Sequence, residues 1–225
     1  LFGTPSIEML DIYDEIYSYL YVCPTHETSS VEELNFIESV LVFFVNRDFA
    51  AAHPDAHDKW INRANSASWF SDAWEKAYQY ADQLVELREN TGLQSVALGE
   101  AYLKRFRDCS ALQVATNCVA DALIGLGIYK ELPHPPVATI VEDTVSVVEQ
   151  MAEDWYAADV LLRDAMRYVD AKKDVDPELK VELISLIERA AWYAGDSNAG
   201  ALFEREIQRS ESIQVAALLV QARFE

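Results

Sequence analysis

The stretch from Trp74 to Glu89, WEKAYQYADQLVELRE, carries the pattern that decides the fold class. Residues at three-and-four spacing share one face of an α-helix, and the acidic residues between them lie towards the opposite face. The stretch therefore predicts an amphipathic helix with one buried face, followed by a stop at Thr91 and Gly92. The predicted buried stripe consists of Trp74, Ala77, Tyr78, Ala81, Leu84 and Val85.

The same period recurs on both sides of this stretch. Thr4 and Pro5 are typical of a helix start, and Ser30 with Glu33 is the pattern of a capping box for the next helix. Further helices are predicted over residues 54–64 and 177–194 and from residue 197 onward, and the pattern over residues 93–128 is helical with a break near Asp108. In the first helix, the spacing predicts a buried stripe of Met9, Ile12, Tyr13, Ile16 and Leu20.

The composition favours the same class. Only seven Gly and seven Pro occur in 225 residues, which is few for a sandwich or barrel with many tight turns. Half of the residues are hydrophobic (51%), so the chain can build a substantial core. We therefore expect an all-α fold, a mostly antiparallel bundle of about eight or nine helices.

Pro133-His134-Pro135-Pro136 is the strongest interruption of the helical pattern. Three prolines within four residues are incompatible with a helix interior and stiffen an extended connection. We place the boundary between two packed sub-bundles here, with residues 1–132 on one side and 137–225 on the other. The second sub-bundle is predicted to begin with one long helix, from about Pro136 to Lys172, roughly 50 Å if unbroken.

The chain is strongly acidic, with 38 Asp and Glu against 18 Lys and Arg and a formal net charge of −20. Such a surface repels phosphate backbones and anionic lipids, so binding to nucleic acid or to a membrane surface is disfavoured. It suits a basic protein partner, or it serves solubility alone. No apolar run approaches the roughly 20 residues that a membrane span needs.

The three cysteines are Cys23, Cys109 and Cys118. Their spacing matches neither a disulfide framework nor a zinc site, because no C-x-x-C motif occurs. Cys109 and Cys118 lie in an apolar helical stretch, where free buried thiols are expected. This interpretation favours a reducing compartment such as the cytoplasm.

One candidate metal site consists of His26, His57 and Asp58. An adjacent His-Asp pair with an earlier histidine resembles the HD-type metal-dependent phosphohydrolases, which are all-α. The resemblance covers only these few residues and implies a divalent metal, with Asp121 or Asp143 as a later carboxylate ligand. The alternative interpretation places His57 and Asp58 in the first turn of a short surface helix, where the helix dipole favours an aspartate.

Other known catalytic motifs do not match the spacing of residues in this sequence. The one Glu-x-x-His match, Glu131 to His134, contains a proline, so it cannot present a di-iron ligand pair on a helix. Glu86 and Glu89 form Glu-x-x-Glu, but no Glu-x-x-Asp follows them at the distance that magnesium-dependent pyrophosphohydrolases require, and no phosphate-binding glycine loop occurs. The sequence therefore predicts no catalytic residue and, apart from the metal alternative, no cofactor.

Aromatic residues favour a binding role. Four tyrosines crowd the first helix and cannot all face inward at helical spacing, so some are expected on the surface. The leading hypothesis is a non-catalytic protein-interaction or assembly domain with an acidic helical surface, and self-association is compatible with it. A bundle that carries an apolar small molecule is a further alternative. The four tyrosines are Tyr13, Tyr17, Tyr19 and Tyr21.

Overall fold

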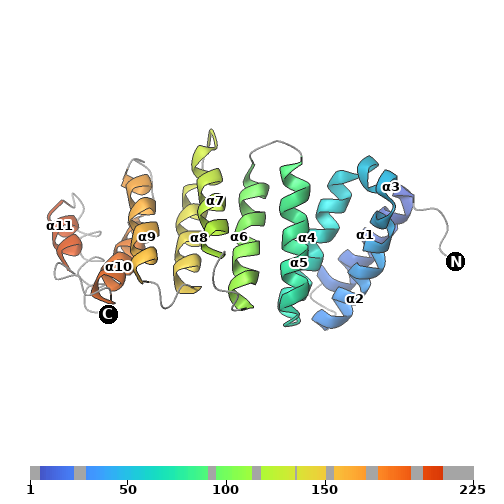
Figure 1. The fold of residues 1–225 in the computed structure, drawn as a ribbon, viewed down its shortest axis with the longest axis horizontal. Helices are drawn as coiled ribbons and strands as arrows, with labels where there is room; N and C mark the ends of the chain where they lie inside the picture. The colour runs from blue at the N-terminus through green and yellow to red at the C-terminus, as the bar shows by residue number, and fades with distance from the viewer. Residues whose placement is uncertain are drawn as a thin grey trace. The chain divides into compact units, whose positions relative to one another are not determined.

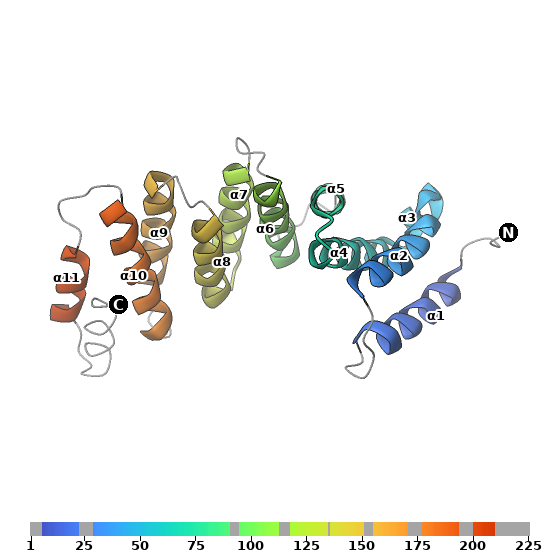
Figure 2. The ribbon, with the colours of Figure 1, turned by 90° about the horizontal axis from the view of Figure 1, so that it is seen from below.

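The computed structural model describes residues 6–22, 29–90, 95–112, 118–134, 136–150, 155–170, 177–193 and 200–209. Within these ranges all regular secondary structure is helical and no strand occurs (Figure 1 and Figure 2). The all-α fold that the sequence predicts is therefore confirmed. Among the described helices, none combines the length and the apolar character needed to cross a membrane.

The helices follow one another with short connections. A π-helical turn, η1 (Ser18–Val22), extends the first helix, and a 3-10 turn, η2 (Val42–Val45), extends the second. The α-helices are α1 (Ile7–Tyr17), α2 (Ser30–Leu41), α3 (Arg47–Ala52), α4 (Pro54–Phe70), α5 (Trp74–Glu89), α6 (Val96–Ala111), α7 (Cys118–Glu131), α8 (Val137–Gln150), α9 (Trp155–Asp170), α10 (Pro177–Tyr193) and α11 (Ala201–Arg209).

The start of α2 shows how the sequence sets a helix boundary. Ser29 accepts a hydrogen bond from the backbone of Glu32, whose carboxylate in turn accepts one from the Ser29 N–H. This reciprocal pair is the capping box, one residue earlier than the predicted pair of Ser30 and Glu33. Ser30 is the first helical residue, and its hydroxyl donates to the carbonyl of Phe70 instead.

The contacts between Cα atoms divide the chain into two compact units, residues 1–121 and 122–225. The division falls inside α7 and therefore earlier than the predicted boundary near Pro133. In the first unit, α2 packs on α4, α4 on α5, and α5 on α6.

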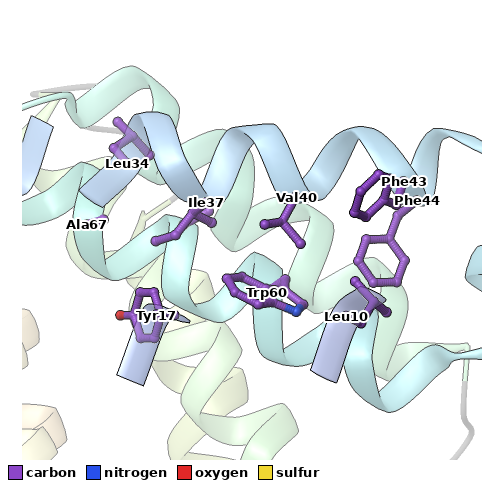
Figure 3. Close-up of a cluster of buried hydrophobic side chains, with 10 residues drawn as sticks. Leu10, Tyr17, Leu34, Ile37, Val40, Phe43, Phe44, Trp60 and Ala67 are labelled. Carbon is purple, nitrogen blue, oxygen red and sulfur yellow. The ribbon is translucent and has the colours of Figure 1, made fainter. Parts of the chain in front are cut away.

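The core of the first unit gathers around Trp60, which is 1% exposed (Figure 3). Side chains from α1, α2, η2 and α4 surround it, and each large apolar side chain buried here stabilises the fold by about 1.5–3 kcal/mol. The cluster comprises Leu10, Tyr17, Leu34, Ile37, Val40, Phe43, Phe44, Trp60, Ala64 and Ala67.

Cys109 and Cys118 form a disulfide, with their Cα atoms 5.7 Å apart. The prediction of two free buried thiols is therefore wrong, and the argument for a reducing compartment loses its basis. The spacing of residues within single helices did not reveal the pair, because Cys109 lies near the C-terminus of α6 and Cys118 is the first residue of α7. Two residues on separate helices meet by packing, which sequence separation alone does not encode.

The second unit contains α8, α9 and α10, each of which packs on the other two. The single long helix predicted from about Pro136 to Lys172 is wrong, because α8 and α9 are separate helices in contact with each other. A stripe of three-and-four period fits two helices that fold together as well as one continuous helix. Their buried stripes form the core with α10, through Ile140, Val141, Leu162, Ala165, Leu183, Ile184 and Ile187.

Candidate interaction site

The inner face of α1 attaches this helix to α2 and α4. Tyr17 is 8% exposed, and its hydroxyl donates a 2.5 Å hydrogen bond to the Glu33 carboxylate on α2. Burial, and then the hydrogen bond to Glu33, raises the pKa of Tyr17 well above its usual value, so the phenol stays protonated as the donor. The guanidinium of Arg63 lies 3.9 Å from the centre of the Tyr17 ring.

Asp14 adds a charged attachment between α1 and α4. Its two carboxylate oxygens accept hydrogen bonds from Lys59 Nζ at 2.8 Å and Arg63 Nη1 at 2.6 Å. Burial alone would raise the pKa of Asp14, but these hydrogen bonds and charges outweigh it and lower the pKa. The carboxylate is therefore ionised and engaged at neutral pH.

A second face of α1, adjacent to the buried one, is unusually apolar for a surface. Ile12, Ile16 and Tyr19 are 57%, 39% and 63% exposed. The sequence predicted a buried stripe that includes Ile12 and Ile16, and for these two isoleucines that prediction is wrong. Apolar residues occur on two adjacent faces of α1, and only the face with Leu10 and Tyr17 enters the core.

Three exposed carboxylates lie beside these apolar side chains, at Glu8, Asp11 and Glu15. None of the three forms an ion pair within the part of the chain that the structure describes. At 100° per residue Glu8, Asp11, Ile12, Glu15 and Ile16 occupy one continuous arc of α1, and Tyr19 follows in the π-helical turn η1. We call this arc the α1 outer face, defined by Glu8, Asp11, Ile12, Glu15, Ile16 and Tyr19.

The charge around α1 is one-sided. No Lys or Arg occurs before Arg47, whereas the first 46 residues contain eight acidic side chains. The cations that reach this region, Lys59 and Arg63, come from α4 and are held by Asp14 on the inner side. The α1 outer face is therefore left with negative charge, which attracts positive charge and repels negative charge. The eight acidic residues before Arg47 are Glu8, Asp11, Asp14, Glu15, Glu27, Glu32, Glu33 and Glu38.

A separate hollow of about 460 Å³ opens beside α2. Its walls come from α2, η2, α4 and α5, and most of its lining is apolar. On one wall the Glu38 Oε1 accepts hydrogen bonds from Lys76 Nζ at 2.7 Å and from the Tyr80 hydroxyl at 3.0 Å. The lining residues are Glu38, Leu41, Val42, Phe44, Val45, His57, Tyr80 and Gln83.

The predicted metal residues lie in different surroundings. The ring of His57 stacks on Phe44 with centroids 4.6 Å apart, and burial lowers its pKa. Asp58 instead accepts two hydrogen bonds from Arg88, at 2.6 and 2.9 Å. His26 lies outside the described residues, so the site of His26, His57 and Asp58 stays a prediction. Among the described residues, no three His, Cys, Asp or Glu side chains are arranged to hold a metal.

The proposed later carboxylates are on different helices. Asp121, on α7, accepts two hydrogen bonds from Arg105, at 2.8 and 2.7 Å. Asp143 lies on α8, in the second unit. Asp121 thus serves an ion pair between α6 and α7.

Of the four tyrosines predicted to crowd the first helix, only one is exposed. Tyr19 lies on the α1 outer face, whereas Tyr13, Tyr17 and Tyr21 pack in or against the core. Sequence reasoning pointed to the right helix for an exposed surface but missed Ile12 and Ile16. The available signal was the excess of apolar residues on α1, more than one buried face can hold.

The chain matches no protein-family model, no curated protein and no solved structure at a significant level. Two features of the first unit are candidate binding sites. One is the α1 outer face, and the other is the hollow beside α2.

Proposed function

We propose that this protein is a non-catalytic interaction domain that binds a basic protein partner through the α1 outer face. The observation that carries the proposal is the combination of three exposed apolar side chains with three exposed carboxylates that form no ion pair with a described residue. Exposed Ile12, Ile16 and Tyr19 supply apolar contact area, and tyrosine is a residue in which the centres of protein interfaces are enriched. Glu8, Asp11 and Glu15 supply charge that selects a cationic partner.

The charge of the whole chain supports this kind of partner. A molecule with a net charge of −20 is repelled by nucleic acid, by anionic lipid and by a second copy of itself. A partner with basic residues flanking an apolar stripe complements both components of the α1 outer face. If the partner presents this stripe on an amphipathic helix that packs along α1, its apolar side chains would contact Ile12 and Ile16. Its cations would then lie near Glu8, Asp11 and Glu15.

Site-specific photo-crosslinking tests the proposal in the native cell extract. A benzoylphenylalanine in place of Ile16 is compared with one in place of Val160 on α9, which is 52% exposed. We expect position 16, and not position 160, to capture a protein of basic isoelectric point. The crosslinking yield should fall as the salt concentration rises from about 0.05 to about 0.5 M, because added salt screens the attraction between exposed charges. Equal capture at both positions, or capture only of acidic proteins, would contradict the proposal.

The captured partner then allows a quantitative test. We expect the triple variant Glu8→Gln, Asp11→Asn, Glu15→Gln to bind it about tenfold more weakly, since each exposed charge contributes on the order of 0.2–1 kcal/mol. A matched control, Asp55→Asn, Glu75→Gln, Glu86→Gln, removes the same charge from other exposed positions of the first unit. The proposal fails if both triple variants lose the same affinity, because the effect would then come from net charge alone.

A further inference from the structure

We propose that the hollow beside α2 is a binding site for a small apolar molecule that carries a hydrogen-bond donor and no negative charge. This site is separate from the α1 outer face, because no residue of α1 lines it. The two proposals can therefore succeed or fail independently.

The size and lining of the hollow fit a small molecule. Its volume of about 460 Å³ falls within the range of about 300–1,000 Å³ that is typical of ligand pockets, which are mainly apolar with a few polar groups. Val42 and Val45 are 60% and 79% exposed, although both are large aliphatic residues that line the hollow. A bound apolar molecule would remove this apolar surface from water.

Two stacked aromatic rings are part of the lining of the hollow. His57 and Phe44 stack with an angle of 10° between their rings. The imidazole of His57 also lines the hollow and carries two ring nitrogens that can form hydrogen bonds with a ligand. Its ring nitrogens form no hydrogen bond with another described residue. A flat apolar ligand can therefore contact these rings and still find a polar partner.

The polar wall selects the charge of the ligand. Lys76 and Tyr80 both donate to Oε1 of Glu38, and within the described residues nothing donates to Oε2. Glu38 thus keeps an acceptor for a hydroxyl or an amine. Glu38 is the one formally charged residue among those that line the hollow, and its ion-pair partner Lys76 is not among them, so a carboxylate or phosphate would contact the carboxylate and not the cation.

Three naphthalene probes of nearly equal shape test this assignment on the full chain. They are 2-naphthalenemethanol, 2-naphthylmethylamine and 2-naphthoate, which are neutral, cationic and anionic. Methyl NMR of Val42 and Val45 should show saturable shifts with the alcohol and the amine, and at least tenfold weaker binding of the naphthoate. The assignment is overturned if no probe gives saturable shifts at these methyls, or if naphthoate binds as tightly as the alcohol.

Substitutions at exposed positions provide a second test of the binding site. Val42→Asp with Val45→Asp replaces the apolar rim and should weaken binding of the alcohol at least tenfold. Val31→Asp on α2, where Val31 is 54% exposed and outside the lining, should change it less than twofold. Unchanged affinity in the double variant would overturn the assignment. If the double variant unfolds, the methyl shifts of the unmodified chain decide whether the hollow binds the probe. Shifts at Val42 and Val45 support the assignment, and shifts only at other residues overturn it.

Discussion

Asp108 on α6 is completely buried and accepts a 2.5 Å hydrogen bond from the side-chain amide of Asn65 on α4. The same Asn65 nitrogen donates to the carbonyl of Ala77 on α5 at 2.9 Å, so one amide joins three helices. Arg107 reaches the other oxygen of Asp108 at 3.0 and 3.1 Å while its guanidinium lies over the Trp69 ring. This polar group holds together the packing of α4, α5 and α6.

Removal of the amide should destabilise the first unit strongly. Asn65→Ala leaves a buried carboxylate and a buried carbonyl each without one donor, and we expect a loss of about 2–4 kcal/mol in the free energy of unfolding. Urea denaturation followed by tryptophan fluorescence measures it. The exposed Gln79→Ala on α5 is the control and should change the value by less than about 0.5 kcal/mol. A loss below 1 kcal/mol for Asn65→Ala would show that the three-helix junction is not held by this amide.

The buried carboxylate also predicts a pH dependence. Burial raises the pKa of Asp108 above its usual value, although Arg107 and Asn65 act in the opposite direction. Between the unfolded pKa near 4 and the raised folded pKa, the folded state binds more protons, so this group's contribution to stability falls as pH rises. Asp108→Asn removes that dependence. The stability of the variant relative to the native chain should therefore increase from pH 4 to pH 7.

Asp14→Asn provides a control of opposite sign. The pKa of Asp14 is lowered, so its contribution to stability is present above about pH 4 and is lost as pH falls below that value. The variant should therefore lose stability relative to the native chain as pH rises from about 2 to 4. The assignment of Asp108 would be contradicted if Asp108→Asn showed no slope above pH 4.

The elements with the strongest period were predictable from sequence. Residues 74–89 form α5, and the small residues of the stripe, Ala77 and Ala81, are fully buried in it. There the apolar residues occupy one face and the charges the other, so only one orientation buries the apolar face. On α1, apolar residues occupy two adjacent faces, and the spacing could not show that Leu10 rather than Ile12 enters the core.

The candidate sites were less predictable, for a different reason. The hollow beside α2 combines residues as far apart in sequence as Glu38 and Gln83, so its existence depends on how four elements pack. The Cys109–Cys118 disulfide likewise depends on two helix ends that meet. Period and capping signals describe single helices. They carry no information on which faces of different helices come together.

The pairing of Asp58 and Arg88 gives a test that separates a structural role from a metal site. Arg88 has a side chain only 10% exposed, and it donates to both Asp58 oxygens and to the carbonyl of Ala97. Asp58→Ala removes both of these carboxylate hydrogen bonds from a largely buried guanidinium, and we expect a loss of about 2–3 kcal/mol in the free energy of unfolding.

The chelator EDTA distinguishes the two roles. If Asp58 acts through Arg88, the loss is the same with and without EDTA, and Asp58→Ala combined with Arg88→Met is more stable than Asp58→Ala alone. A loss that appears only in the absence of EDTA would instead favour the metal hypothesis with His57.

The disulfide gives the final prediction, which concerns both covalent state and stability. Iodoacetamide should label one cysteine of the unfolded, unreduced chain and three after reduction, because Cys109 and Cys118 are joined. The bond closes a loop between residues nine positions apart, so its loss should lower the free energy of unfolding by about 2–3 kcal/mol. The variant Cys109→Ser with Cys118→Ser should show this loss in urea, and Cys23→Ser is the matched control. Three labelled cysteines before reduction would mean that the two sulfurs are not bonded in the protein, and the double variant would then lose no loop constraint.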